Sequence, residues 1–381
     1  MSRRPRVLIA HHSAVLGGTE ASLRTHLEWA RACDYALALP DPGWGPRSAS
    51  IVHRARLAPP VSYRGVDLHG APLRIVTSVV TLTRLIRRLN PDLIVAYASM
   101  SMPVVAAAAK LTRSPCLWHA REIMARRFPA RAFARACSRI VVPSERMARI
   151  LEARISHADG GKIVVIPSPI DPDAYSPPPS ISSLDKLRSD LGLPASGRFL
   201  LMVGQHVPWK GHLDLIQAFP LIRKHVPDVR LILVGGPWTK ADRSHSRRLR
   251  EGARDLAERD LVHFRPPSPE VERHYWAADL LVLPSRAEPF GRVALEAMAA
   301  GLPVVVSEDA GVAPAVAQLS PDLLAKPGDP RALAETVVGA LMVEPDVRRE
   351  WIERGRALVR RSFSAETVVP AIERVYLDAI G

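Results

Sequence analysis

Cysteine is scarce in this chain of 381 residues: Cys33, Cys116 and Cys137 lie far apart and in no metal-ligand spacing. This count excludes a disulfide framework and favours a reducing compartment, so we expect a cytoplasmic protein. Aromatic residues make up only 5% of the chain, and there is no RNA-binding aromatic block, zinc-finger spacing or basic zipper. We therefore expect no nucleic acid partner.

Long apolar runs are also missing. No stretch approaches the roughly 20 apolar residues of a membrane-spanning helix. The apolar run 7–10 near the N-terminus is too short for the core of a signal peptide. The sequence thus predicts neither a transmembrane helix nor a secretory leader.

Acidic residues are few in the first half of the chain. Up to Tyr175 there are 25 Lys and Arg against 12 Asp and Glu, a net charge of +13, whereas the remainder has 27 against 26, a net of +1. A field confined to one half suggests an anionic partner such as a membrane surface or a phosphorylated acceptor. The alternative, a genome that favours arginine, stays open. The excess gathers in two clusters: Arg84, Arg87 and Arg88, and Arg121, Arg126, Arg127, Arg131, Arg135 and Arg139.

What the chain does contain is an alternation of short β-rich runs with longer helical patterns, on both sides of a Pro/Ser-rich segment, 167–183. This alternation predicts an α/β fold with mostly parallel sheets. We expect an N-terminal domain over 1–175, a linker over 176–187 and a second domain over 188–364. The expected strands are 6–10, 35–39, 92–97, 116–119, 140–143, 162–166, 199–203, 230–234, 261–264, 279–283 and 303–306. The expected helices are 19–33, 72–89, 102–111, 144–154, 213–225, 244–258, 293–300, 331–343, 346–361 and 365–380.

Three strand-to-helix turns have the chemistry of anion sites. Gly17 and Gly18 open the first helix, where free backbone N–H groups attract anions. The loop 204–211 carries Lys210 but lacks the spacing of a nucleoside-triphosphatase loop. The segment 284–298 places Glu288 before a helix and Glu296 on it.

This last segment resembles the EX7E signature of retaining glycosyltransferases of family four, which have the GT-B fold of two Rossmann-like domains facing across a cleft. Five further blocks resemble the family in the same order: the glycine loop 17–20, the histidine segment 118–122, the interdomain stretch 166–171, the loop 204–211 and the strand 279–285. The resemblance also implies that the last helix, 365–381, crosses back onto the N-terminal domain.

The resemblance assigns roles residue by residue. It implies that Glu288 and His119 act beside the transferred sugar and that Glu296 binds the ribose. The other implied contacts to an NDP-sugar donor, UDP- or GDP-linked, come from Gly17, Gly18, Gln205, Lys210, Phe290, Gly291, Arg292 and Val293. One departure from the family is Gln205, which stands where an arginine is usual. Either Arg286 or Arg292 compensates, or stabilisation of the leaving group is weaker.

Expulsion of a diphosphate needs preorganised charge, which two helix N-termini and a lysine supply without a metal. We therefore expect no metal and no cofactor. The single Asp-x-Asp, Asp171 to Asp173, lies in the proline-rich segment and is not interpreted as a metal site. Retention by double displacement or by front-face attack both stay open.

The acceptor is the least determined part. The basic N-terminal half favours a lipid-linked or phosphate-bearing acceptor at an anionic membrane, bound by peripheral contact. A soluble enzyme acting on a small-molecule acceptor is the alternative. In another class, a nucleotide-sugar epimerase would share the two-domain architecture.

Overall fold

The computed structural model describes residues 3–12, 17–39, 61–62, 72–178 and 183–381. The chain divides into two compact units: unit 1 comprises Met1–Ile170 and Phe363–Gly381, and unit 2 comprises Asp171–Ser362. The boundary thus comes a few residues earlier than expected from composition. The carbonyl of Tyr175 accepts a hydrogen bond from Nε1 of Trp276 at 2.7 Å, which ties this part of the proline-rich segment to unit 2.

Unit 1 contains a parallel seven-stranded sheet in the order β3-β2-β1-β4-β5-β6-β7. Its strands are β1 (Arg6–Ala10), β2 (Asp34–Leu39), β3 (Val61–Ser62), β4 (Leu93–Ala96), β5 (Cys116–His119), β6 (Arg139–Val142) and β7 (Ile163–Val165). The central strands are almost continuously apolar and buried, as expected when helices cover both faces of a parallel sheet.

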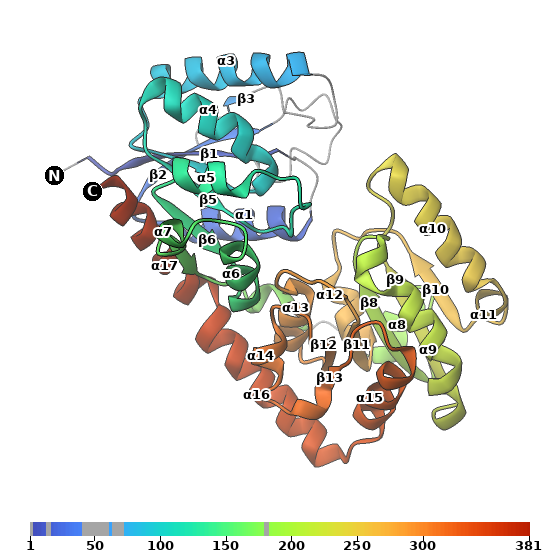
Figure 1. Cartoon of the computed structure of the whole chain (residues 1–381). Coiled ribbons are helices and arrows are strands. Elements are labelled where there is room, and N and C mark those ends of the chain that lie inside the picture. Colours follow the sequence, from blue (N-terminus) through green and yellow to red (C-terminus); the bar gives the residue numbers. More distant parts are fainter. Residues whose placement is uncertain (1–2, 13–16, 40–60, 63–71, 179–182) are drawn as a thin grey trace. The chain divides into compact units, whose positions relative to one another are not determined.

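The helices of unit 1 cover the two faces separately (Figure 1). One face packs on α3 (Pro72–Leu89), α4 (Met102–Thr112), α5 (Ala130–Ala136) and α6 (Glu145–Glu152). The other packs on α1 (Gly18–Trp29) and on the last helix, α17 (Ala365–Ile380), through Val368, Ile372 and Tyr376. The C-terminal helix is therefore part of unit 1.

Unit 2 contains a parallel six-stranded sheet in the order β10-β9-β8-β11-β12-β13. Its strands are β8 (Arg198–Val203), β9 (Val229–Val234), β10 (Val262–Arg265), β11 (Leu280–Leu283), β12 (Val304–Ser307) and β13 (Leu324–Ala325). Its helices are α8 (Leu184–Asp190), α9 (His212–His225), α10 (Lys240–Gly252), α11 (Arg254–Glu258), α12 (Glu272–Ala277), α13 (Arg292–Ala300), α14 (Ala313–Val316), α15 (Pro330–Met342) and α16 (Pro345–Phe363). The prediction of an α/β protein with two Rossmann-like units is confirmed.

The differences from the expected elements have local causes. The helix expected over 244–258 is two helices, because the backbone leaves the helical region at Ala253. The first of them begins earlier, at a capping box formed by Thr239 and Asp242. Inside the expected linker, the Ser183 side chain accepts a hydrogen bond from the Lys186 N–H and thereby starts α8. Residues 179–182 of that linker lie outside the described part of the chain.

Among the described residues, no helix is both long enough and apolar enough to cross a membrane.

Candidate functional site

The candidate site of unit 2 lies where the strand order reverses, at the carboxyl ends of β8 and β11. In open α/β sheets this is the place where ligands bind. The loop after β8 contacts the loop after β11 closely: a Cβ on Gly211, which has φ +79°, would lie 2.3 Å from the carbonyl oxygen of Pro284. The Arg286 N–H also donates to the carbonyl of Trp209 at 2.8 Å. The predicted loops 204–211 and 284–291 therefore form one structure.

Lys210 and Glu288 form a buried ion pair in this structure. The Nζ of Lys210 lies 2.6 Å from Oε2 of Glu288, and the Ser285 hydroxyl donates to the same oxygen at 3.1 Å. The ammonium group also lies 4.4 Å from the ring centroid of Trp209. The structure thus brings together Lys210 and Glu288, both predicted from the sequence. The sequence assigned no role to Ser285, which belongs to the strand block 279–285.

Glu296 lies one turn inside α13 and has both carboxylate oxygens engaged. Oε1 accepts from Nε of Arg292 at 2.7 Å, and Oε2 accepts from the Tyr275 hydroxyl at 2.7 Å. The Tyr175 hydroxyl also bonds to Arg292, and burial raises the pKa of Tyr175 above its ordinary value, so that phenol stays neutral. No spacing in the sequence relates Tyr175 or Tyr275 to Glu296, and only the tertiary structure reveals these partners.

Gly291 provides the backbone geometry at the start of α13. It is the N-cap residue, with φ +104°, and a Cβ there would lie 2.8 Å from a methyl carbon of Val312. Phe290 is buried before it and Val293 is half-buried in the first turn. The backbone N–H groups of this helix start are the anion donors expected from the sequence.

Neither arginine that was expected to compensate for Gln205 offers an uncommitted charge. Arg286 binds Asp214 through two hydrogen bonds, of 2.7 and 3.0 Å, and Arg292 is paired with Glu296. Gln205 itself is half-buried in the loop after β8. In the loop 204–211, Lys210 is therefore the cation predicted to bind the diphosphate. Like the two arginines, it is paired with a carboxylate, that of Glu288.

In unit 1 the strand order reverses between β1 and β4, beside Gly17 and Gly18. Gly17 is the N-cap of α1, and a Cβ on Gly18 would meet nothing within 4 Å among the described residues. After β1, Nε2 of His11 lies 2.8 Å from Oε1 of the buried Glu20. Burial is the largest single influence on Glu20 and would raise its pKa, but the hydrogen bond to His11, the charges of His11 and His12 and a backbone hydrogen bond together lower the pKa below its ordinary value.

His119 ends β5 and is fully buried, with 0% of its surface exposed. Its Nε2 lies 2.8 Å from the Tyr376 hydroxyl on α17, and its Nδ1 lies 3.3 Å from Nη2 of Arg121. Burial, followed by the charge of Arg121, holds the pKa of His119 well below 6.5. The ring is therefore neutral and surrounded by protein, and its contact with a sugar stays a prediction.

The arginine clusters separate on the structure. Arg84, Arg87 and Arg88 are exposed on α3. Most arginines of the second cluster, which lies outside α3, are exposed as well. Arg121 is the exception, because it is buried and does not belong to a surface patch. Val76 and Val80 are exposed by 60% and 41%, because the buried side of the helix runs through Leu82 and Ile86.

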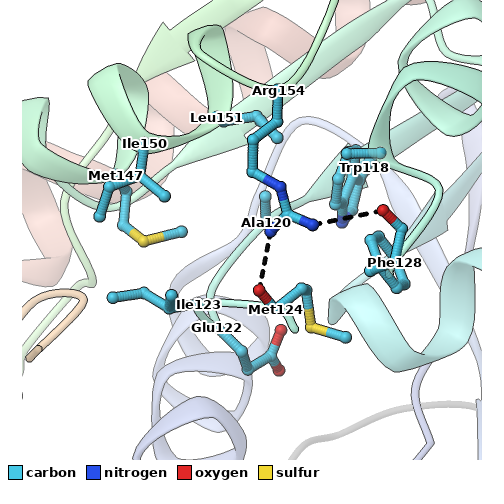
Figure 2. Close-up of a pocket in the computed structure, with 11 residues that line it drawn as sticks. Trp118, Ala120, Glu122, Ile123, Met124, Phe128, Met147, Ile150, Leu151 and Arg154 are labelled. Atoms are coloured by element: carbon cyan, nitrogen blue, oxygen red, sulfur yellow. Dashed lines mark hydrogen bonds between the residues drawn. The ribbon is translucent and has the colours of Figure 1, made fainter. Parts of the chain in front are cut away.

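A small pocket lies behind the carboxyl end of β5, lined mainly by apolar side chains of β5, the following loop and α6 (Figure 2). Arg154 spans it and donates to the carbonyls of Met124 and Phe128. The cavity volume is about 10 Å³, room for about one water molecule. Burial raises the pKa of Glu122 at its edge. The pocket is too small for a sugar.

Both carboxylates of the Asp-x-Asp sequence have partners within the protein. Oδ1 of Asp171 accepts a hydrogen bond from the Asp173 N–H, and the Asp173 carboxylate pairs with Arg360. Within the described residues, no group of three or more His, Cys, Asp or Glu side chains is arranged to hold a metal ion.

The burial of His206, next to Gln205, leads us to expect that the stability of the protein falls at acidic pH. Burial lowers the pKa of His206 from 6.5 to about 4. The unfolded chain therefore binds one more proton than the folded protein between pH 6.5 and 4, and stability falls as the pH falls through this window. The shift corresponds to about 3 kcal/mol at most.

We expect His206→Leu to reduce the slope of unfolding free energy against pH below 6.5, measured by urea denaturation at several pH values. His225→Leu, at an exposed position, is the matched control. Parallel curves for wild type and His206→Leu would contradict the assignment.

Comparisons with known proteins find matches for both units of the chain. Residues 16–174 match the family model described as glycosyltransferase family 4, and residues 184–358 match the model of the glycosyl transferases group 1. A D-inositol 3-phosphate glycosyltransferase of Xylanimonas cellulosilytica is 35% identical over 59% of this chain and 54% of its own length. The chain thus spans about half the length of the curated relatives it matches.

Solved structures extend the likeness to the whole fold. Anabaena HepE, crystallised with UDP and glucose, superposes with a TM-score of 0.83 at 21% identity, covering 97% of this chain and 99% of that one. Sucrose-phosphate synthase from Thermosynechococcus elongatus superposes with a TM-score of 0.77 at 21% identity, covering 99% of both chains. With both units matched in order, the chain belongs to the group 1 glycosyltransferases of the GT-B fold.

Proposed function

We propose that this protein transfers a hexose-type sugar from an NDP-sugar to an acceptor with retention of the anomeric configuration. The observation that carries the proposal is the joined pair of loops in unit 2, which places Lys210, Glu288 and the start of α13 at the carboxyl ends of two adjacent strands. The crystallised complexes of Anabaena HepE with UDP and with UDP-glucose support a UDP-linked donor.

In this proposal the diphosphate leaves against Lys210 and the N–H groups of residues 290–293. Donor binding exchanges the Lys210–Glu288 ion pair for a lysine–phosphate contact and frees Glu288 for the hydroxyls of the sugar. Glu296, oriented by Arg292 and Tyr275, accepts from the ribose hydroxyls. Fixed charge and helix dipoles supply the stabilisation, so no metal takes part.

Glu288→Gln and Glu296→Gln test the proposal, since they keep the shape of each site. We expect Glu296→Gln to raise the Kd for UDP about tenfold and Glu288→Gln mainly to lower kcat by tenfold or more, because a charged hydrogen bond contributes about 1.5–3 kcal/mol. The measurements are calorimetry with UDP and initial rates with UDP- and GDP-sugars, with and without EDTA.

Full activity of both variants, or loss of turnover in EDTA, would disprove these roles. Product analysis with donor alone covers the other enzyme class, since an epimerised nucleotide sugar in the absence of acceptor would identify an epimerase.

For the acceptor, we propose a phosphate-bearing or lipid-linked molecule at an anionic membrane. The relatives are named D-inositol 3-phosphate glycosyltransferases, and these names support an acceptor with a phosphate group. On α3, Val76, Val80 and Arg87 share one side of the helix, with Arg84 and Arg88 next to them. Exposed apolar and cationic side chains side by side suit a headgroup layer.

Replacing Arg84, Arg87 and Arg88 together by glutamine should weaken binding to anionic vesicles about 100-fold, because each arginine contributes about 1 kcal/mol near such a surface. Co-sedimentation at low and high salt measures this. The matched control replaces Arg243, Arg247 and Arg254, exposed on α10 and α11, and should leave most binding intact. Equal loss in both triple variants would argue against a specific role for α3.

A further inference from the structure

Arg121 is a buried cation whose partners are all uncharged. Its side chain, 7% exposed, donates from Nη1 to the hydroxyls of Ser22 and Ser168 at 3.0 and 2.9 Å. From Nη2 it donates to the Tyr97 hydroxyl at 2.9 Å and to Nδ1 of His119 at 3.3 Å. All four Nη hydrogens are therefore used, and among the described residues each of them goes to an uncharged acceptor.

Burying Arg121 in this way costs free energy of folding, which points to a role other than stabilising the fold. A buried charge without a counter-charge loses its hydration and regains only part of it from hydroxyls. The guanidinium lies 4.5 Å from the ring centroid of Tyr97, a second neutral partner. An anionic ligand would find only the Nε hydrogen left on Arg121, so the contacts do not describe an anion site.

The contacts do determine the protonation of His119. A guanidinium can only donate, so Nδ1 of His119 accepts, and the proton of the neutral ring is on Nε2. The Nε2–H then donates to the hydroxyl of Tyr376 on α17. The charge of Arg121 also contributes to the lowered pKa of the neighbouring His26, so it opposes protonation of both imidazoles.

We propose that Arg121 is a positioning residue for His119: its guanidinium fixes the ring as the neutral Nε2–H tautomer and ties it to the first turns of α1 and to the segment around Ser168. Ser22 lies four residues after Gly18, and Ser168 lies two residues before Ile170, where the first segment of unit 1 ends. Tyr376 completes the arrangement from the C-terminal helix. This inference rests on the proposed role of His119 in transfer.

The test is nuclear magnetic resonance of the full chain with ¹⁵N-labelled histidine at pH 7.5, with His119 assigned through His119→Gln. We expect an unprotonated Nδ1 and a protonated Nε2 in the wild type. In Arg121→Met both nitrogen signals should move toward a mixture of tautomers. Tyr376→Phe, which keeps the shape of the core, should shift the Nε2 signal and leave Nδ1 unprotonated.

Kinetics supplies a second readout. Arg121→Met should lower kcat about tenfold or more and change the donor KM less than about threefold, and it should cost nothing further in a His119→Gln background. Arg154→Met is the matched control, because Arg154 bonds to the carbonyls of Met124, Ala125 and Phe128. It should leave the His119 signals in place and combine additively with His119→Gln.

A protonated Nδ1 in the wild type, or full additivity of Arg121→Met with His119→Gln, would overturn the inference. The resonance measurement needs no turnover. If the chain transfers no sugar from any nucleotide donor, the proposed function fails while the tautomer assignment is still decided. If Arg121→Met does not fold, Tyr376→Phe decides it.

Discussion

Lys210→Met is expected to lower kcat/KM with the nucleotide-sugar donor about 100-fold. The substitution removes the cation that, in the proposed function, faces the leaving diphosphate, and it also leaves Glu288 buried without its partner at 2.6 Å. An unpaired buried carboxylate beside an incoming diphosphate adds repulsion to the lost attraction. Initial rates at subsaturating donor measure the effect directly.

Two variants in the same loop give controls of opposite sign. Lys210→Arg keeps the charge and should retain more activity than Lys210→Met. Gln205→Arg adds the cation that the family usually has, and it should raise kcat/KM several-fold, because Arg286 and Arg292 are already paired with carboxylates. If Lys210→Met is as active as the wild type, the diphosphate does not bind at this loop.

Glu373→Ala is expected to destabilise unit 1 by about 3–5 kcal/mol. Glu373 lies on α17, and its carboxylate accepts from the backbone N–H groups of Arg31, Ala32 and Cys33, at distances of 2.8 to 3.2 Å, and from the Tyr35 hydroxyl at 3.0 Å. Truncation leaves these donors without this acceptor in a partly buried turn. Denaturant unfolding followed by circular dichroism measures the loss.

Glu373→Gln should fall between wild type and Glu373→Ala, because the amide keeps one accepting oxygen. Asp378→Ala, at an exposed position of the same helix, is the matched control and should change stability by no more than about 0.5 kcal/mol. A loss of similar size at both positions would mean that α17 as a whole, and not this carboxylate, determines the stability.

Local patterns in the sequence were enough for most of the secondary structure. The strands 6–10 and 116–119 and the helices 72–89 and 365–380 coincide with β1, β5, α3 and α17, because buried parallel strands are continuous apolar runs and amphipathic helices repeat every 3.6 residues. Short elements such as α8 and α12 were missed, since fewer than two turns leave no clear period.

The sequence by itself determined the fold class, the two-unit order and the proximity of Glu288 to the start of a helix, because these follow from residues close together in the chain. Only the tertiary structure decided what those residues touch. It paired Lys210 with Glu288 across 78 residues, and His119 with Tyr376 across 257. It also placed Arg121 in the core, although its sequence neighbours form a surface cluster. Burial and partners of this kind depend on which distant elements pack together, and no local pattern contains that information.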